Sequence, residues 1–442
     1  MTLQIFNRLK SQSQKQRNES ANDRIEKLKK IKTWILKNED RIITALDKDL
    51  SKPKFETYIT EISTTLSELK HNISGLKKWM NPISVPTPLT MLGHRSWVQS
   101  ENKGVVLIIA PWNYPFFLVM SPLISALAAG NTVVIKPSEM TPATSDLLKV
   151  FCEDCFEPNE IHCELGDKTV TQELLGYQFH HVFFTGSTQV GRIVAEQCAK
   201  KLIPATLELG GKSPVIIDET ADLKMTAEKI FWGKFLNRGQ TCVAPDYIYI
   251  HDSVKTKFIE LYNQLDREKS SARPTNMINS FHLQRIKKLS KGAWNESMNT
   301  LLFEIKSVDH PVMQEEIFGP IVPLMTYQTE DELLRHLDFD QRPLTMAFFS
   351  ENQELIERVT RHFPSGSVTI NTINLQVGNS HLPFGGVGSS GYGTSHGYNG
   401  FKEFSHQRSY MKQTFFKSMH AMVMPPYSES KFNLIRKITQ LF

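Results

Sequence analysis

The chain has 442 residues, of which 40% are hydrophobic and 22% charged, and this composition excludes a largely disordered protein. Its length exceeds what one hydrophobic core holds, so we expect two or three domains. The formal net charge of +5, from 51 Lys and Arg against 46 Asp and Glu, is too small over this length to indicate a nucleic-acid partner.

The N-terminal part of the chain is predicted to be helical. It lacks the apolar stretch and the small-residue cleavage site of a secretory signal. Apolar residues recur at spacings of three and four, which is typical of amphipathic helices. The predicted helical stretches are residues 25–35, 42–50 and 58–79. An extended segment is expected near residues 95–99.

An uncharged stretch of 32 residues follows, between Lys103 and Lys136. It is long enough for a membrane span, but Pro111 and the pair Gly130 and Asn131 interrupt a continuous helix. We therefore expect no integral membrane segment. The stretch is predicted to form a buried strand at 105–110, a helix at 117–129 and a second strand at 132–135.

From residue 104 onward short apolar strands alternate with helices, which predicts parallel sheets with crossover helices and hence an α/β fold. The predicted strands are 105–110, 133–135, 182–184, 202–207, 215–217, 247–250, 321–324, 346–349 and 368–370. Near the C-terminus four apolar residues share one helical face, which favours a packed terminal helix over a membrane-surface helix. They are Phe432, Ile435, Ile438 and Phe442.

The cysteines number five, an odd count that does not form a disulfide framework and that indicates a reducing, cytoplasmic setting. Cys152 and Cys155 form a CxxC pair inside a helical stretch, and Cys163 follows at no spacing typical of zinc ligands. No metal site is predicted. These cysteines and Cys198 fit inert packing residues, which is the common role of a buried cysteine.

Cys242 differs from the other four because it follows Gly239 and polar residues in a loop between a predicted helix (231–236) and a strand. Loops held by rigid elements are where reactive groups are usually placed. Glu208 lies at the end of a predicted strand, before a glycine pair. A thiol nucleophile needs a base to activate it or a water molecule, so the two residues are a candidate pair.

Two segments carry a resemblance to a known family. Residues 208–214 (ELGGKSP) and 239–247 (GQTCVAPDY) resemble the aldehyde dehydrogenase superfamily, and the second is similar to its class 3 branch. Five other segments resemble the family in the same order along the chain. They are 110–115 (APWNYP), 135–139 (IKPSE), 184–188 (FTGST), 314–320 (QEEIFGP) and 382–388 (LPFGGVG). The resemblance runs from about residue 20 to 410.

The resemblance implies an α/β aldehyde dehydrogenase fold of three parts. A Rossmann-like dinucleotide-binding domain would comprise residues 1–82 and 102–208, and an α/β catalytic domain residues 209–387. A small oligomerisation arm would comprise 83–101 and 388–410, followed by a C-terminal tail or helix at 411–442. Pairing through the arm implies a homodimer.

The resemblance also implies oxidation of an aldehyde to a carboxylic acid. Cys242 would attack the aldehyde carbonyl, and the Asn113 amide with the backbone N–H of Cys242 would stabilise the oxyanion. Hydride transfer to the nicotinamide would leave a thioester on the cysteine. Glu208 would then deprotonate the water that hydrolyses it.

Cofactor residues follow from the same resemblance, with NAD or NADP as the expected cofactor. Gly186 and Ser187 lie in a glycine turn that leads into a helix, a pattern suited to pyrophosphate but not the GxGxxG form. Lys136 and Glu139 would contact the adenosine ribose, Glu316 the nicotinamide ribose, and Phe318 the nicotinamide ring. The preference between the two cofactors stays open.

The expected substrate is a small-molecule aldehyde. Tyr114, Trp232 and Phe384 would line an apolar entrance, which favours medium or long aliphatic and aromatic aldehydes. The C-terminal helix would cover that entrance.

Three departures from the family pattern leave alternatives open. Arg238, where relatives carry a small residue, would either lower the pKa of the Cys242 thiol or point to solvent. His180 stands where many relatives have an acid. The stretch 266–312 is shortened, which leaves a weakly active enzyme or a non-catalytic scaffold as alternatives. A coenzyme A-dependent acylating enzyme is a further alternative, disfavoured by Glu208.

Overall fold

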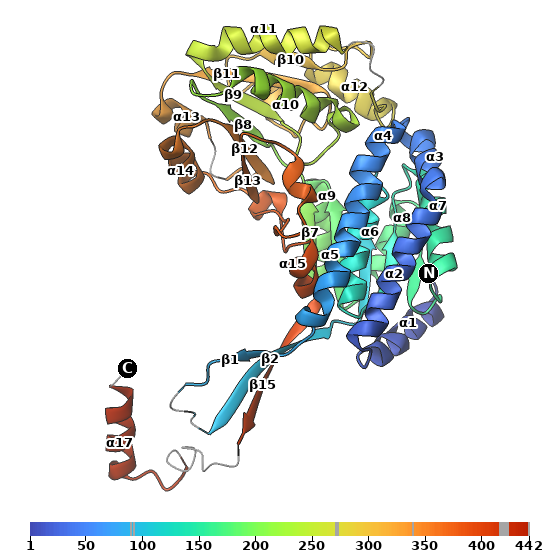
Figure 1. The fold of residues 1–442 in the computed structure, drawn as a ribbon, viewed down its shortest axis with the longest axis vertical. Helices are drawn as coiled ribbons and strands as arrows, with labels where there is room; N and C mark the ends of the chain where they lie inside the picture. The colour runs from blue at the N-terminus through green and yellow to red at the C-terminus, as the bar shows by residue number, and fades with distance from the viewer. Residues whose placement is uncertain (89–90, 92, 270–273, 338–339, 415–423, 441–442) are drawn as a thin grey trace.

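The computed structural model describes residues 1–88, 91, 93–269, 274–337, 340–414 and 424–440. Within these residues two six-stranded sheets form two bodies side by side, and a three-stranded sheet projects from one of them (Figure 1). The α/β class predicted from the sequence is confirmed. No helix of the described residues is both long and apolar enough to cross a bilayer.

The first six-stranded sheet has the order β14-β7-β6-β3-β4-β5. Its neighbouring strands are parallel except at the β14–β7 edge. The strands are β3 (Val105–Ile109), β4 (Thr132–Lys136), β5 (Ile161–Cys163), β6 (His181–Gly186), β7 (Ala205–Leu209) and β14 (Gly391–Tyr392). Every residue of β3 and β4 is buried, as expected for parallel strands covered on both faces.

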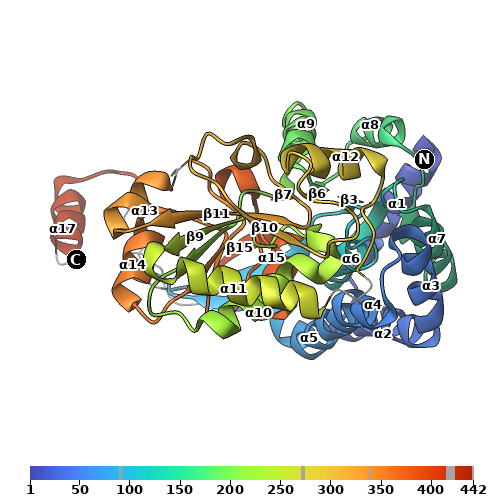
Figure 2. The same ribbon diagram turned by 90° about the horizontal axis from the view of Figure 1, so that it is seen from above.

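Helices cover both faces of this sheet, because alternate side chains of a strand point to opposite sides. One face packs against α2, α3, α5, α6 and α7, the other against α1, α8 and α9. Figure 2 shows the two groups on opposite sides of the sheet. The bounds are α1 (Leu3–Gln16), α2 (Ala21–Lys37), α3 (Glu39–Leu50), α5 (Ser63–Trp79), α6 (Phe117–Ala128), α7 (Pro142–Cys155), α8 (Lys168–Leu175) and α9 (Thr188–Ala199).

The second six-stranded sheet has the order β10-β11-β9-β8-β12-β13 and is parallel throughout. Its strands are β8 (Pro214–Ile217), β9 (Tyr247–His251), β10 (Leu301–Glu304), β11 (Ile321–Tyr327), β12 (Thr345–Phe349) and β13 (Ser367–Ile370). Helices α10 (Leu223–Phe235) and α11 (Asp252–Glu268) cover one face, and α12 (Ser280–Leu289), α13 (Glu330–His336) and α14 (Gln353–His362) cover the other.

The three-stranded sheet joins β1 (Ile83–Val85), β2 (His94–Asn102) and β15 (Ser405–Gln413) in antiparallel order. It projects from the two larger bodies (Figure 1). Within the predicted arm segment 388–410, however, β14 pairs with β7 and α15 (Gly397–Glu403) packs on α5 and α6. The first part of that segment therefore adjoins the first sheet, and the division into domains stays a prediction.

Three local expectations need correction. The strand predicted at 202–207 begins at Ala205, because Leu202 lies in a turn with φ 55° and is 91% exposed. The helix α1 was not predicted, since Phe6 and Leu9 are its only buried apolar residues. The terminal helix α17 (Glu429–Thr439) is present but has no buried residue, and it lies beyond the projecting sheet rather than packed (Figure 1). Phe442 lies outside the described residues.

Between α3 and α5 the chain passes through α4 (Lys54–Thr57) and a π-helical turn, Tyr58–Ile62. The helix predicted at 58–79 is therefore widened over its first turn. Such π-turns are rare inside helices and often occur at functional sites.

Candidate active site

The loop that carries Cys242 begins where α10 ends. Asn237, Arg238 and Gly239 have φ of 49°, 53° and 69°, so the chain reverses through left-handed backbone. At Gly239 a Cβ would lie 2.3 Å from the carbonyl oxygen of Gly319. Only glycine fits there, and the loop is thereby pressed against the 314–320 segment.

Side chains within the loop hold this turn. The Asn237 amide donates to the carbonyl of Gln240 at 3.0 Å, and the Gln240 amide donates to the carbonyl of Asn237 at 3.0 Å. Gln240 also donates to the carbonyl of Asn276 at 2.9 Å and accepts from the N–H of Ile278 at 3.0 Å. The sequence interpretation gave neither Asn237 nor Gln240 a role. Gln240 lies inside the quoted 239–247 motif, which was the available signal, whereas Asn237 lies outside every quoted motif.

A cavity of ≈ 240 Å³ brings the predicted residues of the reaction together. It is lined by Cys242 and Glu208, and also by the predicted substrate residues Tyr114, Trp232 and Phe384. The remaining wall is mostly apolar, with Ile59, Phe117, Leu118, Phe183, Leu236, Leu344 and Leu375 among its residues. The nucleophile and the base candidate thus face one apolar space.

Thr60 and His396 are among the pocket residues that the sequence interpretation did not predict. Thr60 lines the cavity from the π-helical turn. His396 lines it from the start of α15, where its ring stacks on Phe384 with centroids 5.1 Å apart. A polar residue on a helix carries no signal of this kind, because the cavity forms only when distant segments meet.

Glu208 is 5% exposed, and neither carboxylate oxygen has a well-formed hydrogen bond among the described residues. Burial raises its pKa well above the ordinary value, the nearby Glu403 carboxylate raises it further, and the Ser395 side chain acts in the opposite direction. A buried carboxylate with a raised pKa binds a proton more tightly than an exposed one, which suits a general base.

Burial also raises the pKa of the Cys242 thiol to about 12, and the carboxylates of Glu316 and Glu208 add to this effect. The cysteine in the chain alone is therefore a protonated thiol. A neighbouring base is needed to form the reactive thiolate, and Glu208 lines the same cavity.

Asn113 lies against the cysteine loop rather than in the wall of the cavity. Its side-chain amide donates to the carbonyl of Gln240 at 3.1 Å, and its Oδ1 has no partner among the described residues. In the next residue, the Tyr114 hydroxyl forms a hydrogen bond of 2.7 Å with the Thr241 hydroxyl. The structure therefore places Asn113 beside the nucleophile loop, and its role toward an oxyanion stays a prediction.

Four of the predicted cofactor residues, Lys136, Glu139, Gly186 and Ser187, lie at or just after the carboxyl ends of strands of the first sheet. Lys136 ends β4 and pairs with Glu139 at 3.2 Å. Gly186 ends β6, and the Ser187 side chain caps α9 by accepting from the N–H of Val190. The N-terminus of a helix after a parallel strand favours bound phosphate.

The chain also fits the rest of a dinucleotide. Val190 and Ile193, one turn apart on α9, are 43% and 49% exposed, an apolar surface that a base could cover. At Gly210 a Cβ would lie 2.1 Å from the Glu316 carboxylate, so only glycine lets that carboxylate lie this close to the backbone. These features fit NAD or NADP.

Glu316 and Phe318 are held beside the cysteine loop. Burial raises the pKa of Glu316 to about 8, with the Asp246 carboxylate as the next cause. Phe318 has φ 47°, and its ring lies nearly perpendicular to the Trp112 ring, with the two ring centroids 5.4 Å apart. The Arg285 guanidinium supports this segment by donating to the carbonyl of Glu316 at 3.0 Å.

A buried ion pair joins the sequence motifs to each other. Lys212 forms an ion pair with Asp246 and donates to the carbonyls of Val312 at 2.9 Å and Glu315 at 3.0 Å. Asp246 in turn accepts from the N–H of Ile317 at 2.8 Å. Lys212 and Asp246 both lie inside the motifs quoted for the family resemblance, and these motifs are the part of the sequence from which the two residues could have been predicted.

Arg238 fits neither of the two expected roles. It is 6% exposed, donates to the carbonyls of Glu296 at 2.8 Å and Met298 at 3.4 Å, and lies 5.3 Å over the Trp294 ring. The pKa of the Cys242 thiol is raised overall, by burial and by two carboxylates, so Arg238 does not bring it below its ordinary value. Its guanidinium instead ties the loop to the stretch 266–312.

His180 acts as a hydrogen-bond acceptor at the start of β3. Its ring Nδ1 accepts from the backbone N–H of Val105 at 3.0 Å, and the backbone N–H of His180 donates to the Val105 carbonyl at 2.9 Å. An acidic side chain would accept in the same way, so the departure is chemically mild.

The stretch 266–312, which was expected to be shortened, supplies α12 and β10, the edge strand of the second sheet. Asp266 accepts from the N–H and the hydroxyl of Thr300, at 3.2 and 3.1 Å, just before that strand. The stretch thus adds a parallel strand to the sheet, and its shortening stays a prediction.

Comparison with known proteins gives consistent matches. Residues 4–410 match the family described as "Aldehyde dehydrogenase family". The chain is 42% identical over 436 residues to 4,4'-diaponeurosporen-aldehyde dehydrogenase of Staphylococcus aureus (strain NCTC 8325 / PS 47), covering 93% of this chain and 94% of that protein. It is 37% identical over 421 residues to the dimeric NADP-preferring aldehyde dehydrogenase of Rattus norvegicus, covering 91% and 93%.

Solved structures agree with these matches. The substrate-bound state of Staphylococcus aureus AldH superposes with a TM-score of 0.93 at 40% identity, covering 99% of this chain and 100% of that one. PnpE in complex with nicotinamide adenine dinucleotide superposes with a TM-score of 0.84 at 24% identity, covering 93% and 90%. The second likeness is one of fold.

Proposed function

Because the chain belongs to the aldehyde dehydrogenase family and is an NAD(P)-dependent enzyme, we propose that it oxidises an apolar aldehyde to the carboxylic acid through Cys242 and Glu208. The observation that carries the proposal is the cavity they share. Cys242 and Glu208 line one apolar space with Tyr114, Trp232 and Phe384.

The first step is attack by Cys242 on the aldehyde carbonyl. The thiol has a pKa of about 12, so it loses its proton to a base as the carbon–sulfur bond forms. The product is a thiohemiacetal oxyanion. The backbone N–H of Cys242 and the amide of Asn113 are the proposed donors to that oxygen, and loss of one such donor typically costs about 10²–10³ in rate.

NAD or NADP, when bound, supplies the hydride acceptor. We assign Gly186 and Ser187 to its pyrophosphate, and Lys136 and Glu139 to the adenosine ribose. Glu316 would hold the nicotinamide ribose and Phe318 the ring. Lys136 and Gly186 end two parallel strands and Ser187 caps α9, which supports the assignment of the pyrophosphate and the adenosine ribose. The position of Glu316 and Phe318 beside the cysteine loop supports the assignment of the nicotinamide end.

Hydrolysis of the thioester is assigned to Glu208. Its carboxylate would take a proton from a water molecule in the cavity as that water attacks the thioester carbon. The raised pKa of Glu208 and its burial in the wall of the cavity support this role. A base facing the thioester favours hydrolysis over transfer to coenzyme A.

The substrate is proposed to be an uncharged medium or long aliphatic, or an aromatic, aldehyde. Among the described residues that line the cavity, Glu208 and His396 are the acidic and basic side chains, and burial lowers the pKa of His396. No Lys or Arg of the described chain lines the wall, so an anionic substrate would have no counter-ion there. The name of the S. aureus relative makes 4,4'-diaponeurosporen-aldehyde the first compound to test.

We also propose a homodimer and a cytoplasmic setting. β15 forms one edge of the projecting sheet, so its outer side can pair with a second copy. The five cysteines are unpaired, as expected under reducing conditions. Sedimentation of the purified chain tests the first point.

Reduction of NAD and NADP with a panel of aldehydes tests the function, comparing the wild type, Cys242→Ser and Cys155→Ser. Cys155 is a matched half-buried cysteine outside the cavity. We expect activity in the wild type and in Cys155→Ser only. Activity in Cys242→Ser would contradict the mechanism, and a folded wild type that reduces neither cofactor with any aldehyde would contradict the function.

A further inference from the structure

The backbone carbonyl of Asn113 is the meeting point of two buried side chains. It accepts from the Lys52 ammonium at 3.2 Å and from the Asn237 amide at 2.8 Å. Lys52 comes from the chain just after α3, and Asn237 from the cysteine loop. Asn113 is thus fixed from both sides, although neither partner lies in the wall of the cavity.

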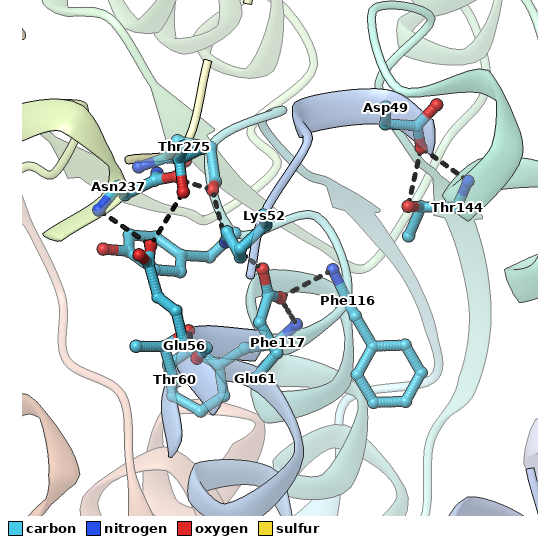
Figure 3. Close-up of polar contacts among 12 residues, drawn as sticks. Asp49, Lys52, Glu56, Thr60, Glu61, Phe116, Phe117, Thr144, Asn237 and Thr275 are labelled. Carbon is cyan, nitrogen blue, oxygen red and sulfur yellow. Dashed lines mark hydrogen bonds and ion pairs between the residues drawn. The ribbon is translucent and has the colours of Figure 1, made fainter. Parts of the chain in front are cut away.

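Lys52 acts together with Glu61 of the π-helical turn. Their side chains form an ion pair at 2.5 Å, and both are fully buried. The other oxygen of Glu61 accepts from the N–H groups of Phe116 and Phe117, at 3.1 and 2.9 Å. Figure 3 shows Lys52 and Glu61 pointing toward each other, with these two N–H groups directed at the carboxylate. The pair therefore holds both ends of the segment 113–117.

Glu56 holds the cysteine loop, which contacts the segment 113–117 from the other side. Its carboxylate accepts from the N–H of Asn237 at 2.8 Å and from the Thr275 hydroxyl at 3.1 Å (Figure 3). Asn237 is in the left-handed region, with φ 49°, and its amide also donates to the Gln240 carbonyl two residues before Cys242. Glu56 therefore sets the orientation of the residue that links Asn113 to the nucleophile loop.

Stability alone does not account for this arrangement. Burying an ion pair carries a desolvation penalty, and apolar residues of similar volume often stabilise a fold as well or better. Here two carboxylates and one ammonium converge on the backbone of two segments instead of filling a core. Such groups are well suited to fixing geometry, because a displacement of about 1 Å at a reacting group can lower the rate by about 10².

We propose that Lys52, Glu56 and Glu61 are positioning residues that set the separation between the Asn113 amide and Cys242. Lys52 and Glu61 hold the segment that carries Asn113, and Glu56 holds the cysteine loop through Asn237. The inference rests on the proposed roles of Asn113 and Cys242.

The test is a double-mutant cycle on single-turnover cofactor reduction by the whole enzyme. We expect Lys52→Met to slow that step by about 10–100-fold, because Asn113 loses one of its two supports. In an Asn113→Ala background, where the amide is already absent, the same change should have less than about a threefold effect. The dissociation constant of the cofactor should not change, since Lys52 lies away from the proposed cofactor residues.

Lys27→Met is the matched control. Lys27 forms ion pairs with Glu19 at 2.6 Å and Glu160 at 2.8 Å, and is 13% exposed, but it is not in contact with the cavity. It should lower thermal stability without slowing the single-turnover rate. Equal slowing by Lys52→Met in both backgrounds, or no slowing in the wild type, would overturn the inference.

A second pair of variants keeps the inference testable if Lys52→Met does not fold. Glu56→Gln retains an acceptor for the Asn237 N–H and should keep the rate within about threefold, whereas Glu56→Ala should lose about tenfold or more. Equal rates in the two variants would contradict the inference. Its failure is separate from failure of the proposed function, which Cys242→Ser measures by itself.

Discussion

The hydroxyl of Thr206 donates to the carboxylate of Glu403 at 2.5 Å, which brings an acid of α15 to the strand that carries Glu208. Thr206 and Glu208 are two residues apart on β7, so their side chains point to the same face. Glu403 thereby adds negative charge near the base candidate. Burial remains the larger reason for the raised pKa of Glu208.

Glu403→Gln should shift the pH dependence of turnover. Glu208 acts as a base in its deprotonated form, so kcat should rise with pH as the raised pKa is passed. Removing the Glu403 charge lowers the pKa of Glu208, and the rising limb should move to lower pH. The measurement is kcat against pH, with the remote Glu354→Gln as control. An unchanged limb would show that Glu403 does not act on the base.

Glu208→Gln should allow one turnover and then stop. Cofactor reduction precedes hydrolysis, so a burst of reduced cofactor equal to the enzyme concentration is expected, followed by a steady rate lower by about 10²–10⁴. Rapid mixing measures the burst, and mass spectrometry detects the acyl group on Cys242. Steady turnover equal to the wild type would contradict the assignment.

Alkylation of Cys242 by iodoacetamide should be slow at neutral pH and should accelerate as pH rises. The thiolate is the reacting form, and the pKa of this thiol lies at about 12. Burial raises the pKa of Glu316 to about 8, so its carboxylate is charged above that pH. In that range Glu316→Gln removes a negative charge that raises the pKa of the thiol, so alkylation there should be faster than in the wild type. The rates are measured without cofactor, and Glu315→Gln serves as the control. A slower reaction in Glu316→Gln would reverse the expected sign.

Arg238→Met should destabilise the fold without altering the thiol. The change removes the hydrogen bonds to the carbonyls of Glu296 and Met298 and the contact with Trp294. We expect a loss of about 1–3 kcal/mol in the free energy of unfolding, measured with urea. The pH dependence of Cys242 alkylation should match the wild type. A shift in that dependence would support the expectation that Arg238 acts on the thiol.

The sequence was most informative for buried strands and for the segments that resemble the family motifs. Nine strands from residue 104 onward were predicted from apolar runs, which are typical of parallel strands buried on both faces, and all nine are present, although the one predicted at 202–207 begins at Ala205. The short strands β5, β10 and β14 and the antiparallel strand β15 were not predicted. The family resemblance predicted Cys242, Glu208 and three aromatic residues, and the structure places these five around one cavity.

The supporting groups could not be read in the same way. Lys52, Glu56 and Glu61 look like ordinary charges near a helix start, and their partners are backbone groups more than 50 residues away in the sequence. Arg238 likewise reaches carbonyls that only the folded chain brings near. Backbone partners leave no mark in a sequence pattern, so tertiary contacts of this kind escape prediction.

The pairing of β2 with β15 connects the projecting sheet to the first six-stranded sheet at two places. The ladder runs without interruption from His94 to Asn102, and β2 continues into β3 after only two residues. At the other strand, Ser405 directly follows the turn that ends α15, the helix of Glu403. A displacement of the projecting sheet would therefore move both β3, in the middle of the first sheet, and α15, the helix that carries Glu403.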